Sequence, residues 1–163
     1  MGTRDLRRGA GFTLIELMLV ILLIAVITAI AIPNLISARK SANEVAAIGS
    51  LKTIANGQQL FRESDKEGDN EFDFGTLQEL SNTTIIDGTL GGANRAGYNF
   101  QTNPGSVNPS FLWFALANPR TPGSSGDRYF CTNHRGQIFY TTDSSVTGNF
   151  TTCDIPTTML LVR

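Results

Sequence analysis

The sequence predicts an α+β fold in which one long N-terminal helix packs on a small antiparallel β-sheet head. Two observations predict the helix, and a third predicts the sheet. From Leu17 to Ile32 the chain is apolar except for Thr28. Helix-favouring residues then continue to about Phe61, with few helix breakers among them. The remainder is polar and rich in Gly, Asn, Thr and Ser, and its short apolar segments between turn residues are typical of strands.

Composition excludes several classes of function. The 163 residues provide about one domain, and a net charge of −1 offers no basic field for nucleic acid. The chain has one histidine, His134, and two cysteines, which are too few for the usual four-ligand zinc site. Any Ser-His-Asp or Cys-His catalysis would depend on His134 alone. We therefore expect a protein that is not an enzyme, with no catalytic residues, no metal and no cofactor.

The first eleven residues have a different character from the rest of the chain. They hold three arginines and one acid: Arg4, Arg7, Arg8 and Asp5. A basic segment before an apolar one has the form of a targeting signal. The positive-inside rule keeps the arginines in the cytoplasm and sends the C-terminal part across the membrane. An ordinary secretory signal peptide, cut after Ala31, is the alternative interpretation.

Glu16 argues against that alternative, because it lies inside the apolar segment, four residues after Phe12. A lone carboxylate in hydrocarbon costs on the order of 2.5–3.5 kcal/mol, and a signal that is later discarded has no reason to carry it. An acid in a membrane segment indicates a function and needs a partner. No Lys or Arg follows until Arg39. The partner can be an amino group that cleavage just before Phe12 creates, on the same or a neighbouring subunit.

The segment from Gly11 to Leu17 resembles the prepilin peptidase site of type IV pilins and type II secretion pseudopilins. It reads Gly-Phe-Thr-Leu-Ile-Glu-Leu after a short basic leader. The resemblance implies a pilin-like fold, leader cleavage between Gly11 and Phe12, N-methylation of Phe12, and a role for Glu16 in assembly. Pro33 falls where many pilins carry a helix-kinking proline. The strong resemblance covers Gly11 to about Ser41.

These patterns divide the chain into four parts. We expect a leader peptide at 1–11, a transmembrane and filament-core helix at 12–35, an amphipathic helix at 36–62 and a globular β-rich head at 63–163. Because proline removes a backbone hydrogen bond, Pro33 should bend the helix or melt it locally. The amphipathic part has one apolar stripe that can pack on the head, at Ala47, Leu51, Ile54, Gln58 and Phe61.

An acidic segment follows the helix. Between Arg62 and Asp73 six acids surround one internal cation, Lys66. Oxygen ligands suit calcium, but the segment does not complete the EF-hand pattern. A solvated loop is favoured, and calcium binding by Glu63 to Asp73 stays open.

In the head we expect a short helical turn at 76–80 and, after residues 85–86, a glycine-rich turn. Strands are expected at 96–102, 111–117, 128–132 and 137–142, with a hairpin turn at 133–136 between the last two. An aromatic cluster should form the core under the sheet, made of Tyr98, Phe100, Phe111, Trp113 and Phe114.

Cys131 and Cys153 are the two cysteines. A translocated head lies in a compartment that permits disulfides, and one intrachain bridge would contribute ~3 kcal/mol. Many type IV pilins carry a C-terminal disulfide loop, so the resemblance implies a bond between these two residues. Asn82 and Asn149 match the glycosylation acceptor pattern, a match that is mostly chance in a bacterial chain.

Together these observations predict a structural subunit of a type IV pilus or related filament. Its expected partners are copies of itself, other pilins, the prepilin peptidase and methyltransferase, an inner-membrane assembly platform, and lipid before assembly. The precursor would be a single-pass inner-membrane protein with an extracytoplasmic head, and the assembled form an extracellular pilus or periplasmic pseudopilus. A minor pilin or a pseudopilin of a secretion or DNA-uptake machine is the first alternative. A single-pass membrane protein with a small extracytoplasmic binding head is the second.

Overall fold

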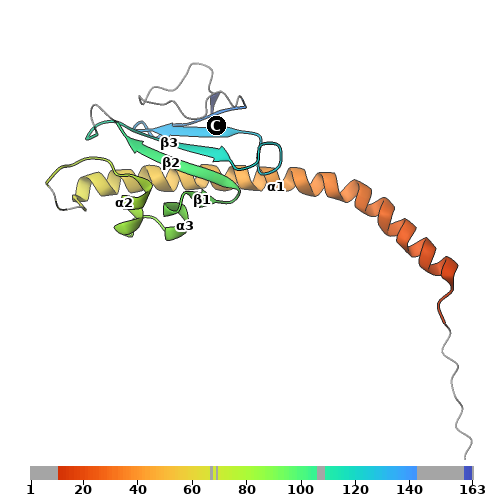
Figure 1. The fold of residues 1–163 in the computed structure, drawn as a ribbon. Helices are drawn as coiled ribbons and strands as arrows, with labels where there is room; N and C mark the ends of the chain where they lie inside the picture. The colour runs from red at the N-terminus through yellow and green to blue at the C-terminus, as the bar shows by residue number, and fades with distance from the viewer. Residues whose placement is uncertain (1–10, 67, 69, 106–108, 143–159, 163) are drawn as a thin grey trace, which may run out of the picture. The chain divides into compact units, whose positions relative to one another are not determined.

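The computed structural model describes residues 11–66, 68, 70–105, 109–142 and 160–162. By their internal contacts the residues fall into two units, 1–37 and 38–163. The helix α1 (Leu14–Ser64) contributes its first part to one unit and its second part to the other. Figure 1 labels the helices and strands.

The helix α1 confirms the long N-terminal helix and extends it to Ser64. It remains helical through Pro33, so local melting, one of the two expected effects of this proline, does not occur. The missing N–H of Pro33 nevertheless leaves the carbonyl one turn earlier without its usual donor.

The second unit contains an antiparallel sheet with the strand order β1-β2-β3-β4-β5-β6, which confirms the predicted sheet. Its strands are β1 (Asn94–Arg95), β2 (Tyr98–Pro104), β3 (Trp113–Pro119), β4 (Tyr129–Asn133), β5 (Ile138–Thr141) and β6 (Leu160–Leu161). Each predicted strand overlaps one of the four longer strands. The strands β1 and β6 were not predicted, because each has two residues and is too short to show an alternation of apolar and polar side chains.

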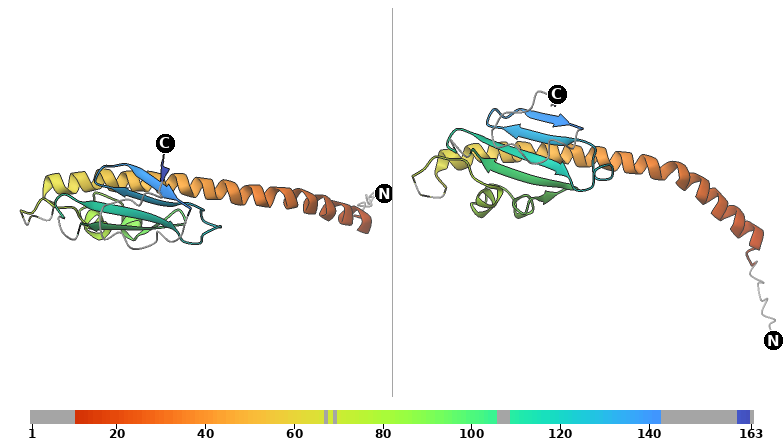
Figure 2. Two further views of the ribbon diagram at one scale, coloured as in Figure 1. Left: turned by 90° about the horizontal axis from the view of Figure 1, so that it is seen from above. Right: turned by 45° about the horizontal axis from the view of Figure 1, so that its top comes forward.

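The second part of α1 lies along one face of this sheet in the views of Figure 2. The predicted stripe is confirmed, because all five of its residues are buried. Its apolar members join a core with side chains of the sheet that include Tyr98, Phe100, Trp113 and Phe130. Burial of these apolar surfaces is the main force that joins helix and sheet.

Two of the five predicted core aromatics lie elsewhere. Phe111 is 67% exposed, because it precedes β3 and the strand begins only at Trp113. The Arg62 guanidinium stacks 5.6 Å from the Phe111 ring centroid. Phe114 is buried but belongs to a second cluster with Leu116 and Cys131, since neighbouring residues of a strand point to opposite faces.

A fully buried polar side chain connects α1 to the head. Gln58 Nε2 donates to the Gly75 carbonyl at 2.6 Å and to Thr102 Oγ1 at 3.1 Å, and Gln58 Oε1 accepts from the Gly75 N–H at 3.0 Å. The Thr102 hydroxyl in turn donates to the Phe114 carbonyl at 3.1 Å. The amide thus makes three hydrogen bonds to groups on a connecting segment and on β2. The sequence placed Gln58 on the packing stripe without indicating these partners.

The loop between β3 and β4 is held on α1 by Glu44, which is buried. Glu44 Oε1 accepts from the backbone N–H groups of Asp127 at 2.9 Å and Arg128 at 3.2 Å. Glu44 Oε2 accepts from Arg128 Nε at 2.7 Å and forms an ion pair with Arg128 Nη2 at 2.6 Å. Lys40 adds an ion pair to Asp127 at 3.1 Å. We call these four residues the loop clamp.

Tyr98 holds the same loop through a hydrogen bond. Its hydroxyl donates to the Arg128 carbonyl at 2.9 Å. Burial raises the pKa of Tyr98, and the Glu44 carboxylate raises that pKa further. The phenol therefore stays a neutral donor throughout the physiological pH range.

Two short helices complete the head. The helix α2 (Leu77–Asn82) confirms the predicted helical turn and begins with a capping box in which Thr76 and Glu79 bond each other's backbone N–H groups. The predicted glycine-rich turn is instead the helix α3 (Gly88–Gly91). Asp87 caps α3 by accepting from the Leu90 N–H at 2.9 Å, and this bond is the main reason why the pKa of Asp87 is lowered.

Candidate assembly site in the N-terminal segment

The N-terminus of α1 is capped by Thr13. Its hydroxyl oxygen accepts from the Glu16 N–H at 3.2 Å, and its carbonyl accepts from the Leu17 N–H at 3.3 Å. Thr13 and Glu16 have the spacing of a capping box. This cap was not predicted, although the Thr-x-x-Glu pattern at Thr13 and Glu16 is sufficient to indicate it.

Gly11 and Phe12 lie just before the helix, outside regular secondary structure. Both are exposed, and a Cβ built on Gly11 would meet nothing within 4 Å. The peptide bond between them therefore lies in a non-helical segment. An extended segment can enter a protease active site more readily than a helix. The arginines of the basic leader lie outside the described residues.

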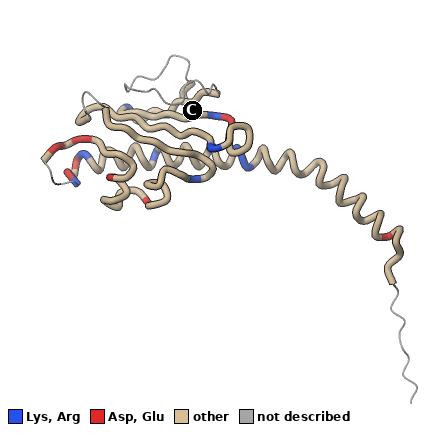
Figure 3. The backbone as a smooth tube through the Cα atoms, viewed as in Figure 1, with Lys and Arg blue, Asp and Glu red and all other residues tan. Residues whose placement is uncertain are grey.

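Glu16 lies in the first turn of α1 with its side chain exposed. It is the one charged residue among residues 11–37, the described part of the first unit, and Figure 3 shows this part of the chain tan apart from one acidic position near its start. Within the described residues it belongs to none of the three ion pairs. An acid in the first turn interacts favourably with the helix dipole, which gives Glu16 a local role. The dipole contributes only ~0.3–1 kcal/mol, less than the insertion cost of ~2.5–3.5 kcal/mol, so this role does not account for the acid in a membrane.

The surface that follows Glu16 is apolar. From Phe12 to Ile36 every large apolar side chain is exposed, from 43% for Val20 to 83% for Phe12. The helix α1 is long and apolar enough to cross a membrane by length and composition. Burying one such side chain fully is worth ~1.5–3 kcal/mol, so this surface must be covered by lipid or by other chains.

Thr28 is the one polar residue between Leu17 and Ile32, and it does not interrupt the apolar surface. Its hydroxyl donates back to the helix, with contacts of 2.9 Å to the Ile24 carbonyl and 3.0 Å to the Ala25 carbonyl. A hydroxyl with its own acceptors can be buried at little cost.

The two sites predicted in the head remain predictions. Cys131 is buried in the second cluster, but Cys153 lies outside the described residues, so their pairing is not tested. In the acidic segment, Glu67 and Asp69 also lie outside the described residues. Among the residues that the structure describes, no group of three or more His, Cys, Asp or Glu side chains is arranged to hold a metal ion.

Comparison with known proteins adds independent information on the N-terminal segment. Residues 6–32 match the family model described as the prokaryotic N-terminal methylation motif. No solved structure matches the chain.

Three curated relatives align with parts of this chain. The type IV wide pilus major component PilA4 of Thermus thermophilus is 42% identical over 57 residues, which are 35% of this chain and 44% of the relative. The type IV major pilin protein PilA of Myxococcus xanthus is 38% identical over 76 residues, 46% of this chain and 34% of the relative. The type II secretion system core protein G of Aeromonas hydrophila is 29% identical over 56 residues, 34% of this chain and 39% of the relative. The alignments thus span less than half the length of each relative.

Proposed function

We propose that this chain, as a member of the family of type IV pilins and type II secretion pseudopilins, is a structural subunit of a type IV pilus or related filament. We assign it no catalytic role. The observation that carries the proposal is the exposed apolar surface of α1 directly after a methylation motif. One surface can serve two environments, because lipid covers it in the precursor and neighbouring helices cover it in the filament.

The proposed route begins in the inner membrane, with the leader 1–11 in the cytoplasm and the head outside. A prepilin peptidase cuts between Gly11 and Phe12, and the new Phe12 amine is N-methylated. The helix of 12–35 then leaves the lipid at an assembly platform and enters the filament core, while 36–62 supports the head of 63–163. The exposed, non-helical position of Gly11 and Phe12 supports cleavage at the bond between them.

A pseudopilin or minor pilin is the second candidate. The similarity to the secretion system core protein G supports it. The same N-terminal chemistry serves both functions, so the two candidates differ in copy number and in where the filament ends. Abundant sheared surface filaments containing this chain would favour the pilus, and a short periplasmic fibre would favour the pseudopilus.

Intact-mass analysis of the purified chain tests the proposal. We expect a mature N-terminus at Phe12 with one added methyl group, and filaments recovered by shearing or by periplasmic extraction. The variant Gly11→Val should retain the leader and form no filaments, because the peptidase needs a small residue there. A matched control, Ala10→Val, places the same side chain one residue earlier and should be processed. A mature N-terminus after Ala31 would overturn the proposal.

A further inference from the structure

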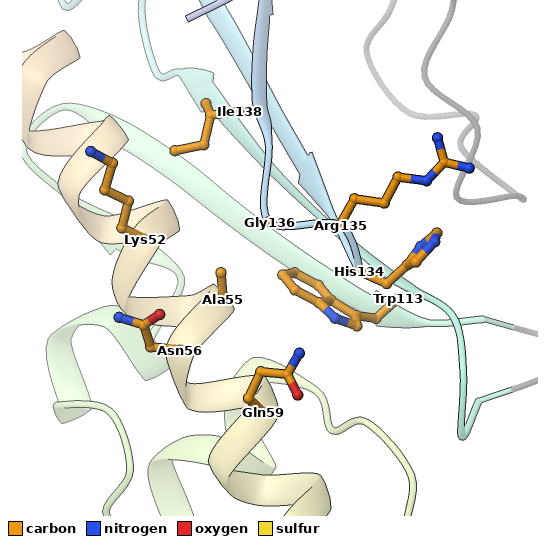
Figure 4. A pocket seen from close by; sticks show the side chains of 9 residues that line it. All are labelled: Lys52, Ala55, Asn56, Gln59, Trp113, His134, Arg135, Gly136 and Ile138. Carbon is orange, nitrogen blue, oxygen red and sulfur yellow. The ribbon is translucent and has the colours of Figure 1, made fainter. Parts of the chain in front are cut away.

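A cleft on the head has the chemistry of an anion site. It has a volume of about 410 Å³ and lies between α1 and the start of β3 with the β4–β5 turn. Figure 4 shows Lys52 on the helix and Arg135 on the turn, on different walls of the cleft, with their charged ends pointing away from each other. The exposed amides of Asn56 and Gln59 add further hydrogen-bond donors. No Asp or Glu is among the lining residues in the described part of the chain.

Trp113 supplies a second, independent observation. The side chain is 1% exposed and lines the cleft, and its Nε1–H has no acceptor among the described residues. In Figure 4 the nitrogen-bearing edge of the indole lies on the side of Gln59, whose side chain is exposed. A buried donor without an acceptor is costly and calls for an explanation. An acceptor that enters the cleft and displaces the Gln59 side chain would satisfy it.

A segment with several carboxylates fits this arrangement. Each carboxylate accepts hydrogen bonds through both oxygens, and separate carboxylates can supply the opposite charge to Lys52 and to Arg135. The same chain carries such groups in its acidic segment, where Glu63 and Glu71 are exposed. Figure 3 shows acidic residues gathered beyond the C-terminal end of α1. Every copy therefore presents a donor-rich cleft and a segment of opposite charge.

A helical filament needs two different, complementary surfaces on each subunit, because only a head-to-tail contact can propagate without closing. We propose that the cleft formed by Lys52, Asn56, Gln59, Trp113 and Arg135, here named the cationic cleft, binds the acidic segment of a second copy of this chain. This inference rests on the proposed function and adds the head surfaces that meet in the filament.

Charge reversal in the full-length chain tests the pairing. The cleft variant carries Lys52→Glu and Arg135→Glu, and the segment variant carries Glu63→Lys and Glu71→Lys. Each should lower the yield of sheared filaments by about tenfold or more, as expected if roughly 1.4 kcal/mol is lost per contact. The four substitutions together should restore the yield, since opposite charges again face each other. Arg120→Glu reverses an exposed cation outside the cleft and should change the yield little.

Each other outcome overturns the pairing. A cleft variant with normal yield would show that the cleft is not a contact. Reduced yields without restoration in the combined variant, at normal membrane levels of processed chain, would show that another anion or partner occupies it. If the wild-type chain keeps its leader and forms no filament, the proposed function itself fails. If it is processed and assembles while the cleft variant also assembles, only the cleft pairing fails.

Tryptophan fluorescence gives a second measurement, because Trp113 is the one tryptophan of the chain. A new hydrogen bond from the indole and a carboxylate nearby should change its emission. We expect the emission of wild-type filaments to differ from that of the same chain in detergent. Residual filaments of the cleft variant should lack this difference. Identical emission in wild-type filaments and detergent would contradict entry of the acidic segment.

Discussion

At the residue scale, a polar side chain in the core can specify position more sharply than an apolar one. Gln58 has no exposed surface, and its amide bonds both backbone groups of Gly75 as well as Thr102. A Leu at this position could slide or turn with small loss, whereas an amide with three fixed partners permits one arrangement. The amide therefore fixes where the second part of α1 sits along the sheet.

Gln58→Ala should destabilise the head by ~3 kcal/mol, because it removes these bonds and leaves the Gly75 groups buried without partners. Thermal unfolding of the full-length chain in detergent, followed by circular dichroism, measures the loss. Gln59→Ala is the matched control, since it truncates the neighbouring exposed amide and should change stability by less than ~0.5 kcal/mol. Equal effects of both variants would contradict the role given to Gln58.

Gln58→Glu gives a pH-dependent form of the same test. A carboxylate still accepts from the Gly75 N–H but cannot donate to the Gly75 carbonyl. Burial raises the pKa of the introduced carboxyl, so the folded state binds its proton more tightly than the unfolded state. The variant should therefore be nearest to wild type at low pH and lose relative stability as pH rises through the raised pKa. A stability difference from wild type that is constant between about pH 4 and pH 8 would contradict this account.

At the element scale, the loop clamp decides how the β3–β4 connection is held. Glu44 is 8% exposed in its side chain, whereas Arg128 is 35% exposed, so the acid is the member that depends on its partner. Removing one member of such a pair leaves a buried charge and costs more than the pair itself contributes. Arg128 also stacks on Phe130 and Tyr140.

Arg128→Met should lower stability by ~3 kcal/mol, because it removes the cation that pairs with the buried Glu44 carboxylate. Adding Glu44→Leu removes the unpaired charge but also the acceptor of the Asp127 and Arg128 N–H groups, so it should recover only part of this loss. Lys40→Met is the control, since its partner Asp127 is 56% exposed and such pairs contribute about 0–1 kcal/mol. A double variant less stable than Arg128→Met alone would show that the clamp stabilises the head directly.

The disulfide belongs to the same scale, since it would join β4 to the C-terminal segment. Cys131→Ser and Cys153→Ser should each lower the melting temperature by several degrees, from a loss of ~3 kcal/mol. Both variants should keep the N-terminal helix inserted in the membrane. Peptide mapping under non-reducing conditions checks the bond directly. Two unmodified thiols in protein collected from the cell exterior would contradict it.

At the scale of the whole molecule, much of the architecture could be predicted, because local patterns determine it. The stripe on α1 follows the helical period, and the methylation motif is a continuous string. Glu44 could not be placed, since its partners lie 83 and 84 residues away in the chain. Phe111 and Trp113 look alike in a sequence, and the start of β3 alone separates an exposed ring from a core one. Local sequence patterns thus predict where helices and strands form. Contacts between residues distant in the sequence determine which polar side chains become buried.

The proposed role of Glu16 in assembly depends on its pairing with a neighbouring subunit. A carboxylate and the methylated Phe12 amine of a neighbour, about 4 Å apart, attract by ~4 kcal/mol at an effective dielectric of 20. That roughly offsets the insertion cost of ~2.5–3.5 kcal/mol, so in the proposed filament the pair would set position more than it adds net stability. Glu16→Ala should keep membrane insertion and leader cleavage but reduce or abolish filaments.

Glu16→Leu should behave in the same way, although it removes the cost of burying the charge. Cleaved and uncleaved chain in the membrane fraction, measured beside sheared filament, separates processing from assembly. Wild-type filament yield from both variants, at unchanged expression and cleavage, would show that this carboxylate does not direct docking.

The hydroxyl of Thr28, which bonds to its own helix, has a consequence for recognition between subunits. Because both of its acceptors lie on the preceding turn, the side chains from Leu17 to Ile32 offer a neighbour no free hydrogen-bond donor. Apolar contact is non-directional, so one rotation or axial offset of two such helices is nearly as favourable as the next. This stretch can therefore supply cohesion but hardly any information about alignment. In the proposed filament, the alignment of neighbouring subunits therefore depends on groups outside this stretch. These are the charge of Glu16 before it and the polar surfaces of the head after it.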